Sequence, residues 1–199
     1  MTDFKTQEVH LATGDALLIV DIQNDFLPGG SLAVADGDRV IPVLNAYIAK
    51  FQQHGMPIYA TRDWHPPDHD SFTRQGGPWP EHCVAGSKGA EFPAALLLPE
   101  TAHIVSKGVD KATDGYSAFA ATALHSHLDH ACIKRLFIGG LATDYCVLHT
   151  VCDALQYRYR VFLLQDAICA VNINPADGQN AAREMLANGA EPVTLEMIA

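Results

Sequence analysis

The sequence predicts an α/β protein: a three-layer α/β/α sandwich around a mainly parallel central sheet with Rossmann-like topology. Short, near-continuously apolar segments alternate along the chain with segments whose apolar residues recur at helical spacing. Continuous apolar runs are typical of strands buried on both faces, as in parallel sheets. Alternation of strand and helix favours parallel pairing through right-handed crossovers. Ligands of such sheets bind beyond the carboxyl ends of the strands, so the residues that follow each strand are the candidate site residues.

Six segments are expected to form strands, because each is short and rich in Val, Ile, Leu or Phe. In chain order they are ALLIV (16–20), MPIYAT (56–61), HIVS (103–106), RLFIGG (135–140), YRVFLLQ (159–165) and EPVTLEMI (191–198). Four intervening segments are expected to be helices, namely residues 38–53, 117–127, 143–157 and 174–188. In the first, apolar residues fit a period of 3.6, and Gly189 follows the last in a C-capping position.

Residues 63–98 depart from this alternation. The segment is rich in Pro, Gly, His and Trp and shows little periodicity. A loop of this length inside a compact domain is usually functional. We therefore expect an insertion that contributes to the site.

Length and composition narrow the class of protein. At 199 residues the chain is expected to fold as one domain, residues 1–199. The net charge of −10 argues against nucleic acid as a partner. The polar N-terminus lacks the features of a signal peptide, and no apolar run reaches the roughly 18 residues of a membrane span. Five cysteines without a CxxC pair are typical of a reducing compartment. We therefore expect a cytoplasmic protein with no membrane partner.

Cys146 is the candidate nucleophile. It lies just past an apolar strand and at the predicted start of a helix. The positive end of the helix dipole favours the thiolate, which is the nucleophilic form of cysteine. Free backbone N–H groups at the same place can stabilise an oxyanion. The position therefore suits attack on a carbonyl group.

Asp21 and Lys107 follow two other predicted strands. Asp21 is either a general base beside Cys146 or an aspartate that caps a helix or turn. Lys107 is either a solvated surface lysine or a cation that holds Asp21 and Cys146 in register. The spacing of the residues leaves both alternatives open.

Asp63, His65 and His82 form a candidate metal site. A carboxylate with two imidazoles leaves coordination positions open, as catalytic metal sites need. Three nearby residues could complete the shell directly or through water: His69, Asp70 and Ser71. Cys83 is interpreted as a packing residue rather than a ligand. This ligand set suits Zn²⁺, Fe²⁺ or Mn²⁺.

Aromatic residues accompany these charged candidates. Phe26, Trp64 and Trp79 belong to Pro- and Gly-rich segments, and Tyr116 follows Lys107 in the chain. Such residues are more often part of a core than of a binding site. Their position next to the charged candidates predicts a flat, apolar substrate slot.

These motifs resemble those of the nicotinamidases, often also pyrazinamidases, of the isochorismatase-like cysteine hydrolase superfamily. Four segments carry the resemblance: VDIQNDFLPGGSLAV, TRDWHPPDHDSF with WPEHCVAGSKGAEF, VSKGVDKATDGYSAF, and GLATDYCV. The match runs from Ala16 to the C-terminus. The chain departs from some members at Ser71, where they have a third metal-binding His, and at Tyr145, where they have His.

The resemblance implies a role for each candidate residue. The catalytic triad would be Asp21, Lys107 and Cys146, and the metal ligands Asp63, His65 and His82. The backbone N–H groups of Ala142 and Cys146 would form the oxyanion hole, with a cis peptide at Leu141–Ala142. Substrate would lie against Phe26, Trp79, Tyr116 and Leu141, with Phe26 and Trp79 on either side of its ring.

The resemblance also implies an activity. Nicotinamide would be hydrolysed to nicotinate and ammonia through a cysteine thioester. One divalent metal ion would hold the pyridine nitrogen, with Zn²⁺ as the first candidate and Fe²⁺ or Mn²⁺ as alternatives. Pyrazinamide would also be deamidated, and the cellular role would be NAD salvage. The alternatives are a related cysteine amidase acting on another small amide or N-carbamoyl compound, a vinyl-ether hydrolase of the isochorismatase type, and a binding module that has lost catalysis. A homo-oligomer remains open.

Overall fold

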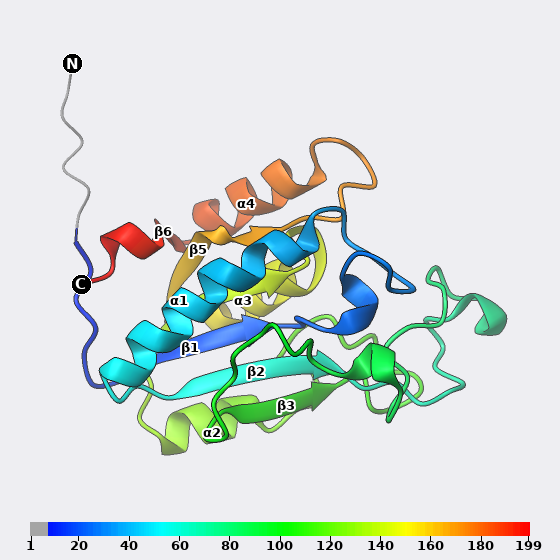
Figure 1. Cartoon of the computed structure of the whole chain (residues 1–199), viewed down its shortest axis with the longest axis horizontal. Coiled ribbons are helices and arrows are strands. Elements are labelled where there is room, and N and C mark those ends of the chain that lie inside the picture. Colours follow the sequence, from blue (N-terminus) through cyan, green and yellow to red (C-terminus); the bar gives the residue numbers. More distant parts are fainter. Residues whose placement is uncertain (1–7) are drawn as a thin grey trace.

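The computed structural model describes residues 8–199 and contains a six-stranded sheet in which every pairing is parallel. The strands are β1 (Asp15–Val20), β2 (Ile58–Asp63), β3 (His103–Lys107), β4 (Arg135–Leu141), β5 (Arg160–Cys169) and β6 (Glu191–Val193). Their order across the sheet is β3-β2-β1-β4-β5-β6 (Figure 1). The predicted fold class is confirmed.

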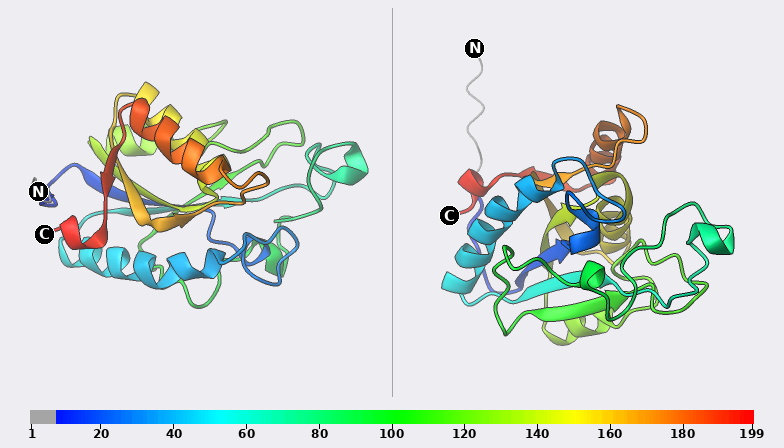
Figure 2. Two further views of the ribbon diagram at one scale, coloured as in Figure 1. Left: turned by 90° about the horizontal axis from the view of Figure 1, so that it is seen from above. Right: turned by 45° about the vertical axis from the view of Figure 1, so that its right-hand side comes forward.

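Helices cover both faces of this sheet (Figure 2). Helix α1 (Val40–Gln53) lies on one face, and α2 (Leu124–His130), α3 (Leu148–Gln156) and α4 (Asp177–Ala187) lie on the other. Strand β1 is buried along its whole length. Leu17 and Ile19 pack on the α1 side, whereas Leu18 and Val20 pack on the opposite side. This two-sided burial explains why the strand is continuously apolar.

The predicted helix at 117–127 is wrong in its first half. Helix α2 begins only at Leu124, and turns occupy the preceding residues. The hydroxyl of Ser117 accepts a hydrogen bond from the N–H of Phe119, and that of Thr122 accepts one from the N–H of Leu124. Hydroxyl groups that bond nearby backbone in this way compete with helical hydrogen bonding.

The predicted strand at 191–198 is too long. Strand β6 ends at Val193, and Leu195–Met197 forms a 3₁₀ turn. The N–H of Leu195 donates to Asp166 Oδ2 at 2.8 Å, and the carbonyl of Met197 accepts from Val9 at 2.7 Å. These tertiary hydrogen bonds draw the chain away from β5 after three paired residues.

The segment between β2 and β3 forms a long loop, as the sequence predicts. Within it the structure has only two short 3₁₀ turns, Thr73–Gln75 and Lys88–Ala90. The loop folds back on itself through bridges between His65 and Val84 and between Phe72 and Trp79. It lies at the carboxyl end of the sheet (Figure 1).

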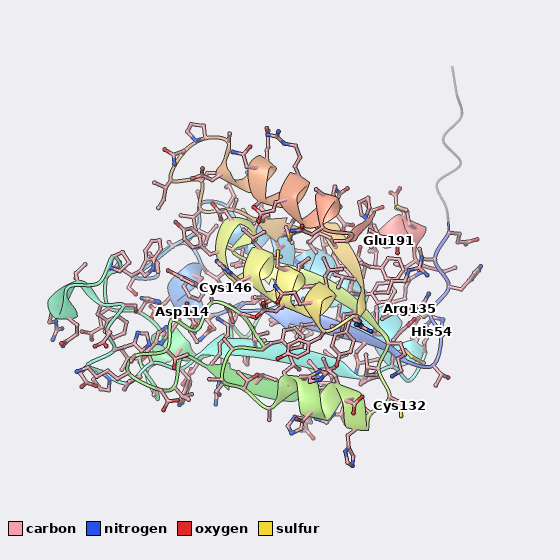
Figure 3. All side chains as sticks on the ribbon, turned by 180° about the vertical axis from the view of Figure 1, so that it is seen from behind. His54, Asp114, Cys132, Arg135, Cys146 and Glu191 are labelled. Carbon is pink, nitrogen blue, oxygen red and sulfur yellow. The ribbon has the colours of Figure 1, made fainter. Side chains whose placement is uncertain are left out.

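The sheet order places a crevice beyond the carboxyl ends of β1 and β4. The connections from β1 run toward β2 and β3, whereas those from β4 run toward β5 and β6, so the loops diverge between these strands. Figure 3 shows Cys146 and Asp114 at this end of the molecule and Arg135 and Cys132 at the other. Across residues 8–199, none of the helices has the length and apolar character needed to span a bilayer.

Candidate active site

Asp21, Lys107 and Cys146 come from three strand ends and meet in the interior. Asp21 directly follows β1, Lys107 is the last residue of β3, and Cys146 lies in a π-helical turn, Thr143–Val147, that follows β4. The ammonium nitrogen of Lys107 lies 2.7 Å from Asp21 Oδ2 and 3.4 Å from Cys146 Sγ. Lys107 is only 1% exposed, which excludes the alternative of a solvated surface lysine.

Lys107 also connects this trio to Asp63. Its ammonium group donates to Asp63 Oδ1 at 2.6 Å and to the carbonyl of Gly115 at 2.7 Å. Together with the contact to Cys146 Sγ, these bonds engage the three donors of the ammonium group. One buried cation therefore stands between two buried carboxylates, and it compensates charges that would otherwise be costly to bury.

The surroundings of Cys146 favour the neutral thiol over the thiolate. Burial raises its pKa, the Lys107 ammonium opposes that rise, and the carboxylates of Asp21 and Asp63 add to it. Burial and the two carboxylates therefore act against the stabilisation of the thiolate that the helix N-terminus is predicted to give. Burial also raises the pKa of Asp21, although Lys107 opposes it. A buried carboxylate of raised pKa is a suitable base for a neutral thiol.

We expect the acid limb of kcat/KM to lie above the ordinary aspartate pKa of about 4. Asp21 accepts a proton only when ionised, so activity falls as pH drops through its raised pKa. The measurement is the pH–rate profile, with bound metal quantified in the same samples because protons compete with metal for histidine. A midpoint at or below 4, or a limb that follows metal loss alone, would contradict the assignment.

Asp63, His65 and His82 offer three ligand atoms that lie within 4.8 Å of one another. In each histidine Nδ1 is bound to a backbone carbonyl: His65 to Gly108 at 2.9 Å and His82 to Pro80 at 2.7 Å. These bonds fix the tautomer and leave Nε2 available as a ligand, which is the usual arrangement of metal-binding histidines. Burial also lowers the pKa of His82, which favours the neutral form that metals require. The donor set fits a divalent metal ion.

The backbone around His65 is shaped for close approach. Gly108 has a φ of +59°, and a Cβ at this position would lie 2.4 Å from Cε1 of His65. Only glycine therefore allows the Gly108 carbonyl to reach the His65 ring.

Gln23 holds Asp63 in place and was not among the predicted site residues. Its buried side-chain amide donates to the backbone carbonyl of Asp63 at 2.8 Å and accepts from the Asp63 N–H at 2.7 Å. Burial raises the pKa of Asp63, but Lys107 and His65 outweigh it, and the carboxyl pKa ends below its usual range. The signal in the sequence was a polar residue two positions after Asp21, beside a strand end.

The residues proposed to complete the metal shell lie in different places. Nδ1 of His69 is 2.7 Å from Ser71 Oγ, and Nε2 is 2.9 Å from the carbonyl of Thr113, so both ring nitrogens are engaged. Asp70 lies 3.8 Å from Lys111 on the surface. Of the three, only Ser71 lines the pocket. Cys83 is buried in the core, as predicted.

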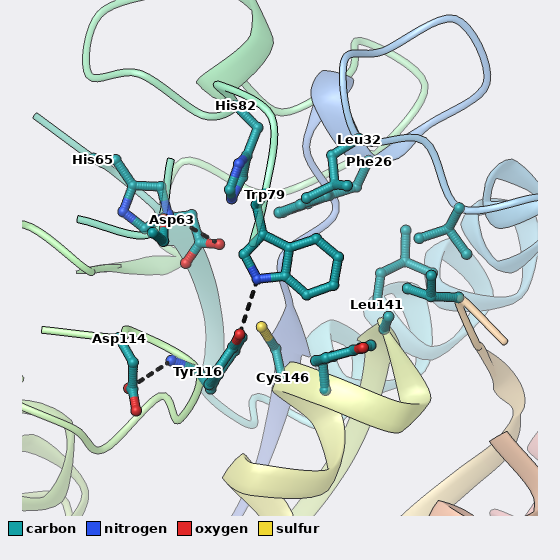
Figure 4. A pocket seen from close by; sticks show the side chains of 15 residues that line it. Phe26, Leu32, Asp63, His65, Trp79, His82, Asp114, Tyr116, Leu141 and Cys146 are labelled. Atoms are coloured by element: carbon teal, nitrogen blue, oxygen red, sulfur yellow. Dashed lines mark hydrogen bonds and ion pairs between the residues drawn. The ribbon is translucent and has the colours of Figure 1, made fainter. Parts of the chain in front are cut away.

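A pocket joins the thiol to the predicted metal ligands (Figure 4). Four residues predicted to bind substrate line it: Phe26, Trp79, Tyr116 and Leu141. The indole N–H of Trp79 donates to the hydroxyl of Tyr116 at 2.9 Å. Trp64 does not line it, and instead the guanidinium of Arg62 lies 3.7 Å from its ring centroid.

The pocket has further lining residues that were not predicted: Leu32, Val34, Asp114 and Val171. Leu32 and Val34 belong to the motif VDIQNDFLPGGSLAV, residues 20–34, and Val171 follows β5. The rule that sites form at the carboxyl ends of strands could have identified Val171.

Ala142 and Cys146 line the same pocket at the turn after β4. The Leu141–Ala142 peptide bond is cis, as predicted. The carbonyl of Ala142 accepts from the N–H groups of Tyr145 and Val147 at 3.0 and 3.1 Å. The turn thereby brings Ala142 and the thiol to one wall of the pocket.

Known proteins are similar to this chain in sequence and in fold. The nicotinamidase of Escherichia coli (strain K12) is 41% identical to this chain, and the match covers 90% of this chain and 94% of that protein. The crystal structure of the Pyrococcus horikoshii pyrazinamidase in complex with zinc is 46% identical, with a TM-score of 0.88, and covers 91% of this chain and 99% of that chain. The structure of PnC1 from L. infantum in complex with nicotinate is 36% identical, with a TM-score of 0.89, and covers 96% of this chain and 98% of that chain.

The isochorismatase domain matches residues 15–197. This range begins with β1, ends at the last residue of the 3₁₀ turn Leu195–Met197, and includes every residue of the pocket. Since the match spans nearly the whole sequence, the chain belongs to the isochorismatase family.

Proposed function

We propose that the protein is a nicotinamidase that hydrolyses nicotinamide to nicotinate and ammonia. The observation that carries the proposal is a single pocket lined by the thiol of Cys146 and by a three-residue set suited to a divalent metal. The similarity to nicotinamidases and pyrazinamidases over most of the chain supports the same activity. Pyrazinamide, a ring amide of similar shape, is a second expected substrate.

Asp63, His65 and His82 would hold the metal ion, with Zn²⁺ as the leading candidate and Fe²⁺ or Mn²⁺ as alternatives. When bound, the ion would supply a Lewis acid that attracts the pyridine nitrogen of the substrate. Phe26 and Trp79 would flank the ring, and Tyr116 and Leu141 would complete the slot. Holding the ring in this way places the carboxamide beside Cys146 and replaces a random encounter with a positioned attack.

The first half of the reaction forms a thioester. Asp21 takes the proton of the Cys146 thiol, and the sulfur attacks the carboxamide carbon. The N–H groups of Ala142 and Cys146 stabilise the resulting oxyanion. Asp21 then returns the proton to the departing ammonia, and the C–N bond breaks. Lys107 stays protonated throughout, since the carboxylates of Asp21 and Asp63 raise its pKa against the effect of burial.

The second half releases nicotinate. A water molecule gives a proton to Asp21 and attacks the thioester carbon, and the same two N–H groups stabilise the second oxyanion. The carbon–sulfur bond then breaks, and Asp21 returns its proton to the sulfur. The cycle ends with the thiol of Cys146 protonated again.

A cysteine amidase for another small amide or an N-carbamoyl compound would share Asp21, Lys107 and Cys146. It would have no use for a ligand set that holds a ring nitrogen. A vinyl-ether hydrolase needs neither the thiol nor this set, and a pure binding module gains nothing from a thiol paired with a base. Comparing ammonia release from nicotinamide and from N-carbamoyl compounds separates the amidases. We also propose a cytoplasmic role in NAD salvage, which is the role that the resemblance to nicotinamidases implies.

Removal of metal by a chelator is expected to abolish ammonia release from nicotinamide, and added Zn²⁺, Fe²⁺ or Mn²⁺ is expected to restore it. The His82→Ala variant is expected to bind metal at least about 10- to 100-fold more weakly than the unaltered protein, because loss of a ligand costs no less than loss of an outer-shell partner that orients a ligand. Metal content by elemental analysis, together with ammonia release, checks both results.

Three outcomes would contradict this proposal in different ways. Activity that survives complete removal of metal would retain the cysteine amidase and remove the metal from the mechanism. Unchanged metal affinity in His82→Ala would exclude His82 from the ligand set. Absence of ammonia release with every metal would exclude nicotinamide as the substrate.

A further inference from the structure

Thr61 lies beside the carboxylate of Asp21, and no step of the reaction above uses it. It belongs to β2 and has no exposed surface. Its hydroxyl donates to Asp21 Oδ1 at 2.6 Å. In the other direction, the N–H of Asp21 lies 3.2 Å from Thr61 Oγ1 and 3.3 Å from the Thr61 carbonyl. Thr61 therefore contacts both the side chain and the backbone of the proposed base.

The backbone of Asp21 explains why this support is needed. Asp21 has a φ of +50°, in the left-handed region that residues other than glycine rarely adopt. Such a conformation persists where surrounding contacts hold it. Hydrogen bonds from β2 fix Asp21 as the chain turns out of β1, so its carboxylate has a defined direction.

The two carboxylate oxygens of Asp21 have different surroundings. Oδ1 accepts the hydrogen bond from Thr61. Among residues 8–199, the only cation near Oδ2 is the ammonium group of Lys107, which lies 2.7 Å away and also donates to Asp63, Gly115 and Cys146. Unlike Oδ1, Oδ2 therefore has no hydroxyl partner and can accept a proton. A carboxylate oxygen of Asp21 lies within 4.8 Å of Cys146 Sγ.

We propose that Thr61 is a positioning residue, whose hydroxyl orients the Asp21 carboxylate so that Oδ2 takes the thiol proton. The inference rests on the proposed amidase reaction and specifies its base. The proton moves from Sγ to Oδ2, which leaves a thiolate and a neutral carboxyl group, and the sulfur then forms its bond to the carboxamide carbon. The proton leaves Oδ2 with the departing ammonia. The O–H bond of Thr61 stays intact throughout.

Two pairs of proteins isolate the hydroxyl from the rest of the side chain. The unaltered protein and Thr61→Val differ by a hydroxyl in place of a methyl group of similar size. Thr61→Ser and Thr61→Ala differ by the hydroxyl alone. In each pair, loss of the hydroxyl is expected to lower kcat for nicotinamide by about 10- to 100-fold, part of what a positioned general base contributes. KM and metal content are expected to stay unchanged, because neither the slot nor the ligand set contains Thr61.

Thr150→Val is the matched control. Thr150 is also fully buried, and its hydroxyl accepts a hydrogen bond from the N–H of Ala118 at 3.0 Å, away from the pocket. Loss of this hydroxyl is expected to lower the melting temperature and leave kcat unchanged. A fall in kcat equal to that of Thr61→Val would mean that loss of any buried hydroxyl suffices, and would overturn the proposal.

The second pair protects the test against a variant that fails to fold. A higher kcat in Thr61→Ser than in Thr61→Ala supports the proposal. A kcat of Thr61→Val within about twofold of the unaltered protein, or equal values for the serine and alanine variants, would overturn it. Failure of the proposed substrate is recognised separately, since the unaltered protein would then release no ammonia.

If nicotinamide is not the substrate, the rate at which iodoacetamide alkylates Cys146 still tests whether Thr61 positions Asp21, because alkylation needs no substrate. Deprotonation of the thiol by Asp21 precedes attack on the reagent. Alkylation is therefore expected to be slower in Thr61→Val than in the unaltered protein, and slower in the alanine variant than in the serine variant. Equal rates within both pairs would overturn the proposal.

Discussion

Replacement of Cys146 by alanine is expected to lower kcat for nicotinamide by about 10⁴-fold or more, as loss of a nucleophile does in other enzymes. No other described cysteine lines the pocket, so no thiol nearby can replace it. Substrate affinity and metal content are expected to persist, because the ring slot and the ligand set remain. Steady-state kinetics, calorimetric titration of nicotinamide and elemental analysis of the variant provide the measurements.

Cys152→Ala is the matched control for that experiment. Cys152 lies on helix α3, which directly follows the turn that contains Cys146, but it does not line the pocket. Its removal is expected to leave kcat close to that of the unaltered protein. Turnover by Cys146→Ala at the unaltered rate would exclude the thioester mechanism, whereas loss of metal or substrate binding would show that the effect is structural.

Replacement of Lys107 by methionine is expected to lower the free energy of unfolding by roughly 3–5 kcal/mol at neutral pH. The ammonium group lies 2.7 Å from Asp21 Oδ2 and 2.6 Å from Asp63 Oδ1, and its removal leaves two buried carboxylates uncompensated. Activity is expected to fall as well, since one of these carboxylates is the proposed base. Urea denaturation of the metal-free proteins measures the change without a contribution from metal binding.

The dependence of this loss on pH follows from Asp63. Lys107 and His65 hold its pKa below the usual range despite burial, so its ion pair adds stability above the unfolded-state pKa of about 4. That contribution disappears as pH falls through the lowered, folded-state pKa. The difference in stability between the unaltered protein and Lys107→Met should therefore shrink in acid.

Two further variants test the interpretation of the Lys107 experiment. Adding Asp63→Asn to Lys107→Met removes one of the unpaired charges and should recover part of the lost stability. Lys111→Met removes a half-exposed lysine that contacts Asp68 on the surface and should change stability by about 1 kcal/mol or less. A loss of similar size in Lys107→Met would contradict the view that the ammonium group compensates both carboxylates.

The strands were predictable because burial on both faces leaves a local mark. A strand such as β1 has no polar face, so five consecutive apolar residues identify it without any knowledge of its neighbours. Helix α2 was predicted too early because the hydroxyls of Ser117 and Thr122 form turns that apolar periodicity does not register. The end of β6 depends on Asp166, a residue distant in sequence.

The identity of the main site residues was predictable from the sequence, but their protonation and their hydrogen-bonding partners were not. Residues that follow apolar strands were identifiable as Asp21, Lys107 and Cys146, since the carboxyl ends of parallel strands gather at one edge. Their protonation was not, because the pKa of the Cys146 thiol depends on how completely the fold excludes water. Gln23 and Thr61 were missed for a related reason. Each acts through a hydrogen bond to a residue about 40 positions away.

The sequence by itself thus determined the alternation of strands and helices and the residue types at the strand ends, because both follow from local patterns. Only the tertiary structure decided that one lysine lies between two carboxylates, that burial raises the pKa of the Cys146 thiol, and that a threonine hydroxyl donates to one oxygen of the proposed base. Distances between segments set these properties, and they exist only after the sheet has assembled.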